Sequence, residues 1–137
     1  MTQAGGEPDL PGFRCLVADD SAFARHYLGV IVGRLGGAVV AEAGDGAQAV
    51  ELFARHRPEL VFLDITMPDL DGVEALRRIR ACDTEARVIM VSALGHKEMV
   101  WKAICLGAKH FITKPFTADY AGVVIRSVLK GEGQAAQ

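Results

Sequence analysis

The sequence lacks several features by which some protein classes are recognised. Its 137 residues carry a formal net charge of −2, so the excess of basic residues that is typical of nucleic-acid-binding proteins is missing. There is no apolar stretch of about 18 residues, and the N-terminus lacks the charged and then apolar segment of a secretion signal. We therefore expect a cytoplasmic protein that binds neither nucleic acid nor a membrane.

Cysteine is scarce and poorly placed for chemistry. Cys15, Cys82 and Cys105 lie far apart, without a CxxC pair and without histidines at the spacing of metal ligands. This spacing disfavours a redox or metal-binding role for the thiols. Cys15 falls within an apolar run, where we expect it to pack as a small hydrophobic residue.

Common enzyme motifs are also missing. The sequence contains no Walker A, GxGxxG or GxSxG motif, which disfavours nucleotide-dependent enzymes and hydrolases. The composition is nevertheless that of a folded protein, because 50% of the residues are hydrophobic and 23% are charged. The length is sufficient for one domain with a core of its own.

Short apolar runs alternate with longer segments of helical periodicity along most of the chain. The apolar runs predict strands over residues 13–18, 38–43, 60–63, 88–91 and 110–113. The other segments predict helices over residues 24–35, 47–53, 73–80, 100–104 and 120–129. Strict alternation is typical of an α/β fold in which helices cover both faces of a parallel sheet. We expect one domain over residues 13–130, between flexible tails over 1–12 and 131–137.

Polar side chains come directly after most of the predicted strands. Asp19 and Asp20 follow the first strand, and Asp64 follows the third. Ser92 follows the fourth strand and Lys114 follows the fifth. Because ligands bind beyond the carboxyl ends of the strands in an open parallel sheet, we expect these residues to meet at one edge.

The chemistry of that edge indicates phosphoryl transfer. Three carboxylates a few ångströms apart repel one another, and a hard divalent cation such as Mg²⁺ removes the conflict. An Asp in this setting can act as a nucleophile, with Lys114 as a counter-charge for the phosphoryl group. Taken alone, Asp19 and Asp20 are equally compatible with a solvated turn that caps a helix.

Four stretches of the sequence resemble the response-regulator receiver domain in their order and spacing. They are Asp19–Asp20, Leu63–Gly72, Val91–Ala93 and Lys114–Phe116. The resemblance covers about residues 13–130. It implies the flavodoxin-like, doubly wound (βα)5 fold, with a five-stranded parallel sheet of order 2-1-3-4-5. The strand order comes from the resemblance and not from the apolar pattern.

The resemblance also implies roles for the acidic residues. Asp64 would be the phospho-acceptor, and Asp19, Asp20, Asp64 and the backbone carbonyl of Thr66 would hold Mg²⁺. A phosphatase that works through an aspartyl phosphate is the enzymatic alternative, but it usually carries a second Asp two positions after the first. That position is Thr66, which cannot serve as acid or base. We expect a phospho-accepting switch that assists its own phosphorylation and dephosphorylation.

Further residues would contact the phosphoryl group and report its presence. By the same resemblance, Ser92 hydrogen-bonds the phosphoryl group and Lys114 pairs with it, next to a Lys114–Pro115 bond that is expected to be cis. Phe111 falls at the aromatic switch position, where the ring turns inward when the Ser92 hydroxyl moves toward the phosphate. An ordinary core role is the alternative for Phe111.

Longer matches resemble the chemotaxis CheY branch of this family. They are Asp64–Pro68, Ser92–Val100 and Leu106–Ile112. They imply a monomer that is phosphorylated by a histidine kinase, binds a flagellar motor switch protein and is acted on by a phosphatase. The alternative is a stand-alone receiver in another phosphorelay, which passes the phosphoryl group to a histidine phosphotransfer protein or binds another effector.

The partner surface is expected where the fourth helix meets the fifth strand. The residues of this strip are Val100, Ile104, Ala108 and Phe111. The resemblance implies that the strip is partly exposed, and packing into the core is the alternative. Trp101 is expected to contribute to packing, and Leu94 falls at a position that tunes phosphoryl hydrolysis in the family.

Overall fold

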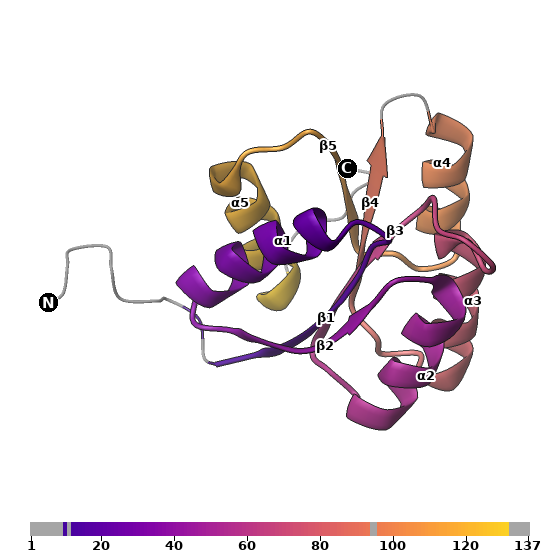
Figure 1. Cartoon of the computed structure of the whole chain (residues 1–137), viewed down its shortest axis with the longest axis horizontal. Helices are drawn as coiled ribbons and strands as arrows, with labels where there is room; N and C mark the ends of the chain where they lie inside the picture. Colours follow the sequence, from indigo (N-terminus) through magenta and orange to yellow (C-terminus); the bar gives the residue numbers. More distant parts are fainter. Residues whose placement is uncertain (1–9, 11, 94–95, 132–137) are drawn as a thin grey trace, which may run out of the picture.

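A computed structural model describes residues 10, 12–93 and 96–131 (Figure 1). The strands are β1 (Arg14–Ala18), β2 (Ala38–Ala43), β3 (Leu60–Asp64), β4 (Val88–Ala93) and β5 (His110–Lys114). The helices are α1 (Ala22–Arg34), α2 (Gly46–His56), α3 (Gly72–Cys82), α4 (Lys97–Cys105) and α5 (Ala118–Leu129). In the described part of the chain, none of these helices is both long enough and apolar enough to cross a membrane.

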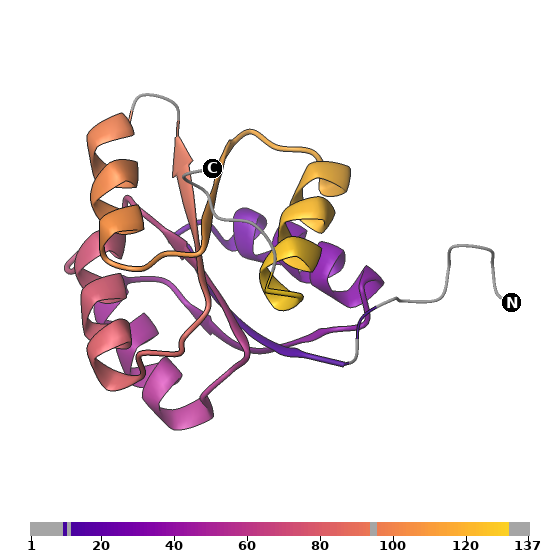
Figure 2. The ribbon, with the colours of Figure 1, turned by 180° about the vertical axis from the view of Figure 1, so that it is seen from behind.

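All the strands belong to one parallel sheet with the order β2-β1-β3-β4-β5, which confirms the predicted fold class and strand order. Helices α1 and α5 cover one face, and α2, α3 and α4 cover the other (Figures 1 and 2). The chain runs from β1 outward to β2 and then returns to place β3 on the other side of β1. The carboxyl ends of β1 and β3 therefore frame the crevice in which this class of fold binds ligands.

Two hydrophobic clusters, one on each face of the sheet, hold the layers together. Residues of β1 alternate between them, with Cys15 and Val17 facing α1 and α5 while Leu16 faces the other three helices. All residues of β3 and β4 except Ala93 are buried, which explains why residues 60–63 and 88–91 of these strands are continuous apolar runs in the sequence. The expected packing of Cys15 is confirmed, and burial raises the pKa of its thiol.

Strands β3 and β5 are one residue longer than predicted. Each includes the polar residue that the sequence places just after it, because Asp64 still pairs with Val91, and Lys114 with Ala93, in the parallel ladder. The carboxylate and the ammonium are therefore positioned by the sheet and not by a loop. Helices α4 and α5 begin before the residues that were predicted for them. Their first residues are mostly exposed, so they do not belong to the apolar pattern from which the helices were predicted.

The ends of the predicted domain fall only partly within the described residues. Leu10 lies in the predicted N-terminal tail, yet it is 7% exposed and packs in the cluster beneath α1 and α5. The packed region therefore starts before residue 13, the predicted boundary. Most of the two predicted tails lies outside the described residues, as does Leu94.

Close packing at Gly72 brings the start of α3 against the end of β3. The side chain of Asp71 caps this helix by accepting a hydrogen bond from the Glu74 N–H at 2.9 Å. The Gly72 N–H donates to the Ile65 carbonyl at 2.8 Å. A Cβ at position 72 would overlap the backbone carbonyl of Asp64, so glycine is required for the helix to begin this close to the site.

Candidate functional site

Asp64 lies at the carboxyl end of the central strand β3 and is only 6% exposed. Its Oδ2 accepts a hydrogen bond from Lys114 Nζ at 2.9 Å, and its Oδ1 accepts one from the Thr66 N–H at 3.1 Å. Burial raises the pKa of the Asp64 carboxyl, while the hydrogen bonds from Lys114 and Thr66 oppose that shift. The two bonds fix the orientation of a carboxyl group that has lost most of its contact with water.

Lys114 joins the ends of the first and third strands across the sheet edge. Its Nζ lies 2.9 Å from Asp19 Oδ2 and 2.9 Å from Asp64 Oδ2. Burial by itself lowers the pKa of this ammonium, but the hydrogen bonds to both carboxylates outweigh it, so the pKa is raised. The Lys114–Pro115 bond is cis, as expected. One ammonium thus compensates part of the charge of two acids.

Asp19 is held at the end of β1 by several contacts. It is 1% exposed, its N–H donates to the Ala43 carbonyl at 2.9 Å, and its Oδ1 accepts from the Ser21 N–H at 2.9 Å. The Arg25 guanidinium donates to the Asp19 carbonyl at 2.6 Å and to Glu42 Oε1 at 2.9 Å. Arg25 therefore fastens α1 to β1 and β2. Sequence reasoning missed this residue, because its partners come together only in the fold.

Three carboxylates converge beside the lysine. One oxygen from each of Asp19, Asp20 and Asp64 lies within 4.8 Å of the other two, and Asp20 is exposed to solvent. Lys114 neutralises only part of this charge. A set of carboxylate oxygens with one side open to water suits a hard divalent cation, so the residues fit the Mg²⁺ expected from the sequence. The backbone N–H of Thr66 is bonded to Asp64, whereas the metal contact of its carbonyl stays a prediction.

Ser92 and Phe111 lie on the strands beyond the acceptor strand, at the same side of the sheet. Ser92 is buried, and its hydroxyl donates to the carbonyl of Ala93 at 2.9 Å. Phe111 is half-buried against the cluster beneath α2, α3 and α4, and its ring centroid lies 6.1 Å from that of His110. The Ser92 hydroxyl thus bonds to the neighbouring residue, and the Phe111 ring is partly in the core and partly in solvent. Their phosphoryl contact and switching stay predictions.

The predicted partner strip is only partly exposed. Three of its residues are half-buried against the core: Val100, Ile104 and Phe111. Ala108 is 3% exposed, so its assignment to the surface is wrong. The turn after α4 folds it inward, where its N–H bonds to the Ala103 carbonyl at 3.0 Å. The packing expected of Trp101 is also wrong, because it is 65% exposed on the side of α4 away from Ala103.

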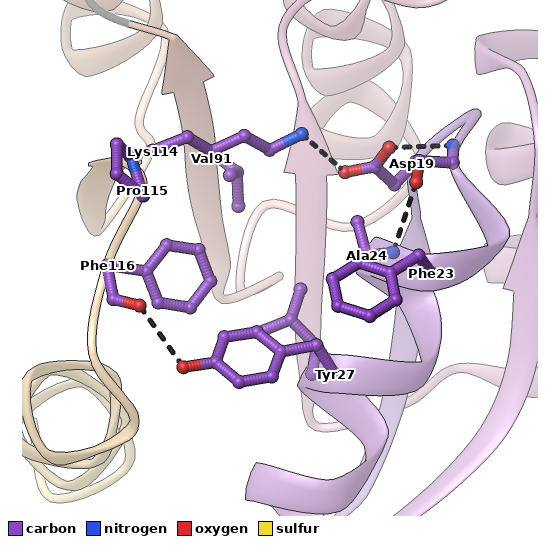
Figure 3. Close-up of a pocket in the computed structure, with 10 residues that line it drawn as sticks. Asp19, Phe23, Ala24, Tyr27, Val91, Lys114, Pro115 and Phe116 are labelled. Atoms are coloured by element: carbon purple, nitrogen blue, oxygen red, sulfur yellow. Dashed lines mark hydrogen bonds and ion pairs between the residues drawn. The ribbon is translucent and has the colours of Figure 1, made fainter.

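A groove beside the acids is marked by no sequence motif. It has a volume of about 460 Å³ and lies between α1 and the segment that follows β5. Figure 3 shows that Lys114 and Asp19 meet at its rim, with the rings of Phe116, Tyr27 and Phe23 below them. Sequence reasoning missed it, since Phe116 is far in the chain from Phe23 and Tyr27 and comes beside them only in the fold.

Comparison with known families shows which group of proteins shares this arrangement. The family model for the response regulator receiver domain matches residues 15–122, which is most of the chain. The chain belongs to this family. The receiver domain carries its acids, serine and lysine at the carboxyl ends of β1, β3, β4 and β5, and the resemblance expected from the sequence is confirmed.

The relatives of this receiver domain include chemotaxis proteins. Chemotaxis protein CheY of Bacillus subtilis (strain 168) is 53% identical over 106 residues, which is 77% of this chain and 88% of that protein. Chemotaxis protein CheY of Thermotoga maritima is 44% identical over 119 residues, 87% of this chain and 99% of that protein. A chain in the crystal structure of the CheX–CheY–BeF3–Mg²⁺ complex from Borrelia burgdorferi has a TM-score of 0.81 and 39% identity, and the match covers 85% of this chain and 88% of that chain.

Proposed function

We propose that a histidine kinase phosphorylates this receiver domain on Asp64 and that the phosphoryl group changes the affinity of its surface for a partner. The observation that carries the proposal is the position of Lys114 Nζ, 2.9 Å from both Asp19 and Asp64 at the edge where the acids converge. An oriented carboxylate, a cation beside it and oxygen ligands for a metal ion are what phosphoryl transfer to an Asp requires.

The transfer step follows from the groups around Asp64. One of its oxygens attacks phosphorus, a P–O bond forms, and the bond to the donor breaks with its electron pair leaving on the donor. Mg²⁺, when held by Asp19, Asp20, Asp64 and the Thr66 carbonyl, supplies positive charge for the phosphoryl oxygens. Lys114 shifts from the carboxylate of Asp64 to a phosphoryl oxygen while it stays within reach of Asp19.

The readout begins at Ser92, whose hydroxyl donates to the Ala93 carbonyl before modification. A phosphoryl oxygen carries more negative charge than a backbone carbonyl, so it is the stronger acceptor and draws the hydroxyl toward it. The half-buried ring of Phe111 then turns inward. Phosphorylation thereby shifts an equilibrium between two states, and hydrolysis of the acyl phosphate by the same site resets it.

A chemotaxis role is the second part of the proposal. The identities of 53% and 44% to chemotaxis proteins CheY support a flagellar motor switch protein as the partner of the active state. The proposed docking surface consists of Val100, Ile104 and Phe111 together with the exposed Trp101. We also propose that a phosphatase removes the phosphoryl group. The similarity to a chain of a CheX–CheY complex supports a second protein partner. We propose that the receiver acts as a cytoplasmic monomer.

Phosphorylation is tested by incubating the protein with Mg²⁺ and a small phosphodonor and measuring its intact mass. The wild type is expected to gain a single phosphoryl group, and Asp64→Asn none. Asp69→Asn is the matched control, because Asp69 is an exposed acid on the loop that follows β3. Equal labelling of Asp64→Asn and the wild type would overturn the proposal.

Motor binding is tested by pull-down with a motor switch protein, with and without the phosphoryl mimic BeF3⁻. Activation is expected to raise the affinity, and Trp101→Ala to remove most of the increase. Arg55→Ala, on the exposed side of α2, is the control and is expected to bind like the wild type. If activation gives no increase, the motor role is wrong, and capture of the phosphoryl group by a histidine phosphotransfer protein would then favour another phosphorelay.

A further inference from the structure

Asp20 differs from the other two acids in how its side chain is held. The carboxylates of Asp19 and Asp64 each accept two hydrogen bonds, one of them from Lys114. Among the described residues, none donates a hydrogen bond to the exposed carboxylate of Asp20. The direction of this side chain is therefore set by the backbone that leads into it.

Arg25 holds that backbone at the peptide group between Asp19 and Asp20. Its Nη1 donates to the Asp19 carbonyl at 2.6 Å. This carbonyl belongs to the same planar group as the N–H of Asp20, so fixing the carbonyl also fixes the plane from which the Asp20 Cα departs. The Asp19 N–H is bonded to the Ala43 carbonyl at 2.9 Å, so the peptide groups on both sides of Asp19 are held.

Glu42 of β2 directs the Arg25 side chain. Its Oε1 accepts a hydrogen bond from Arg25 Nε at 2.9 Å, and the Arg25 N–H bonds to the Ser21 carbonyl at 3.1 Å in the first turn of α1. The side chain of Arg25 is 21% exposed and that of Glu42 is 54% exposed. An ion pair this open to water contributes little to folding. Its effect is to aim a planar guanidinium whose donors lie at fixed angles, which an ammonium group cannot reproduce.

We propose that the Arg25–Glu42 pair positions the metal site, because it aims the Asp20 carboxylate at the point where the oxygens of the three acids converge. The inference rests on the proposed function, in which these acids hold Mg²⁺. This ion demands near-ideal octahedral geometry, so it tolerates a misplaced ligand poorly. Residues that orient a metal ligand without touching the metal typically change its affinity about 10- to 100-fold.

The charge of the pair matters as well as its geometry. An uncompensated guanidinium against the Asp19 carbonyl would repel a divalent cation bound by the neighbouring carboxylates. Glu42 compensates that charge, so the pair holds the peptide group without adding net positive charge beside the metal ion. Loss of Glu42 alone would therefore weaken metal binding both by repulsion and by loosening Arg25. Loss of both side chains removes only the positioning.

Removal of the whole pair isolates the positioning effect, because Arg25→Met combined with Glu42→Met leaves the net charge unchanged. Mn²⁺, which also prefers carboxylate oxygens, is the probe. Its binding is measured from the loss of the free-ion signal in electron paramagnetic resonance, and competition with Mg²⁺ gives the Kd for Mg²⁺. The double variant is expected to raise both Kd values about 10-fold. Arg25→Lys, which keeps the charge and loses the planar fork, is expected to raise them in the same direction.

The matched control is Arg55→Met combined with Glu51→Met, which removes an exposed ion pair within α2 and is expected to keep the wild-type Kd. Asp20→Asn, which removes the ligand that the pair positions, should raise the Kd at least as much as loss of the pair. The rate of Asp64 labelling by a small phosphodonor gives a second readout. The Mg²⁺ concentration for half of the maximal rate should rise with the Kd, while the rate at saturating Mg²⁺ stays near that of the wild type.

A loss of stability alone would not produce this pattern, because a destabilised protein that is still folded binds the metal ion with its original affinity. An unchanged Kd in the double variant, or in Asp20→Asn, overturns the positioning role and leaves the proposed function standing. Absence of Asp64 labelling in the wild type at saturating Mg²⁺ overturns the proposed function itself.

Discussion

Helices α1 and α4 both begin at the edge of the sheet that carries the acids, but they are held in different ways. In α1, the Ser21 hydroxyl caps the first turn by accepting a hydrogen bond from the Ala24 N–H at 3.1 Å, and Arg25 fastens the helix to two strands. In α4, the cap position is His96, whose side chain makes no capping bond, and Ala103 is the buried residue of the helix. Helix α1 is therefore firmly anchored and α4 is weakly anchored.

This difference assigns a separate task to each side of the site. The α1 side holds Asp19 and the groove, and a site that stabilises a charged transition state works best when its groups are already in place. The α4 side carries the proposed partner surface, which must adopt two arrangements in order to report phosphorylation. Segments with few buried contacts open at a lower free-energy cost, so the weak anchoring of α4 suits that task.

The largest expected effect comes from removing the ammonium of Lys114, which contacts Asp19 on the firmly anchored α1 side of the site. Lys114→Met should slow labelling of Asp64 by small donors about 100-fold, because it removes a preorganised charge beside Asp64 that, in the proposed transfer, faces the phosphoryl group. Lys97→Met, at the exposed start of α4, should leave the rate unchanged. Rates of intact-mass labelling provide the measurement. Equal rates for the two variants would show that labelling of Asp64 does not depend on the Lys114 ammonium.

Removal of the Arg25 anchor should have the next largest effect, this time on stability. We expect Arg25→Met to lower the free energy of unfolding by about 1–2 kcal/mol, chiefly through the lost hydrogen bond to the Asp19 carbonyl. Arg55→Met removes an exposed ion pair with Glu51 and should cost less than about 0.5 kcal/mol. Urea denaturation measures both values. Similar losses in the two variants would contradict the anchoring role.

A better N-terminal cap on α4 should reduce the difference in local stability between α1 and α4. His96→Ser introduces a hydroxyl at the cap position and is expected to stabilise the protein by about 0.5–1 kcal/mol. Amide hydrogen exchange should slow in α4 and not in α1. His26→Ser, at an exposed position inside α1, is the control and should produce no such slowing. Unchanged exchange in His96→Ser would show that the cap does not limit the stability of α4.

The reactivity of the cysteines gives a simple further test of the difference in anchoring between α1 and α4, with the smallest expected effect. Cys15 of β1 is buried against α1 and α5, and burial raises its thiol pKa, whereas Cys105 at the end of α4 and Cys82 at the end of α3 are exposed. A thiol reagent should label Cys82 and Cys105 in the native protein and all three cysteines after denaturation. Mass spectrometry counts the labels. Rapid native labelling of Cys15 would show that the α1 side opens as readily as the α4 side.

Much of the fold and part of the site could be predicted from the sequence. The alternation of apolar runs and helical segments was sufficient for the fold class, because strands buried on both faces are apolar over most of their length. The strand order needed the family resemblance. Asp19, Asp64 and Lys114 could be assigned to one site because the carboxyl ends of parallel strands meet at one edge.

The sequence by itself determined which polar residues lie at that edge. Each of them follows or ends a strand, and a strand is recognised from a run of consecutive apolar residues. Only the tertiary structure decided how they and their neighbours are arranged. The ammonium shared by Asp19 and Asp64, the anchoring of Asp19 by Arg25 and the row of rings beside them depend on contacts between residues far apart in the chain. Burial of Ala108 likewise depends on the turn after α4, which the helical periodicity of apolar residues does not predict.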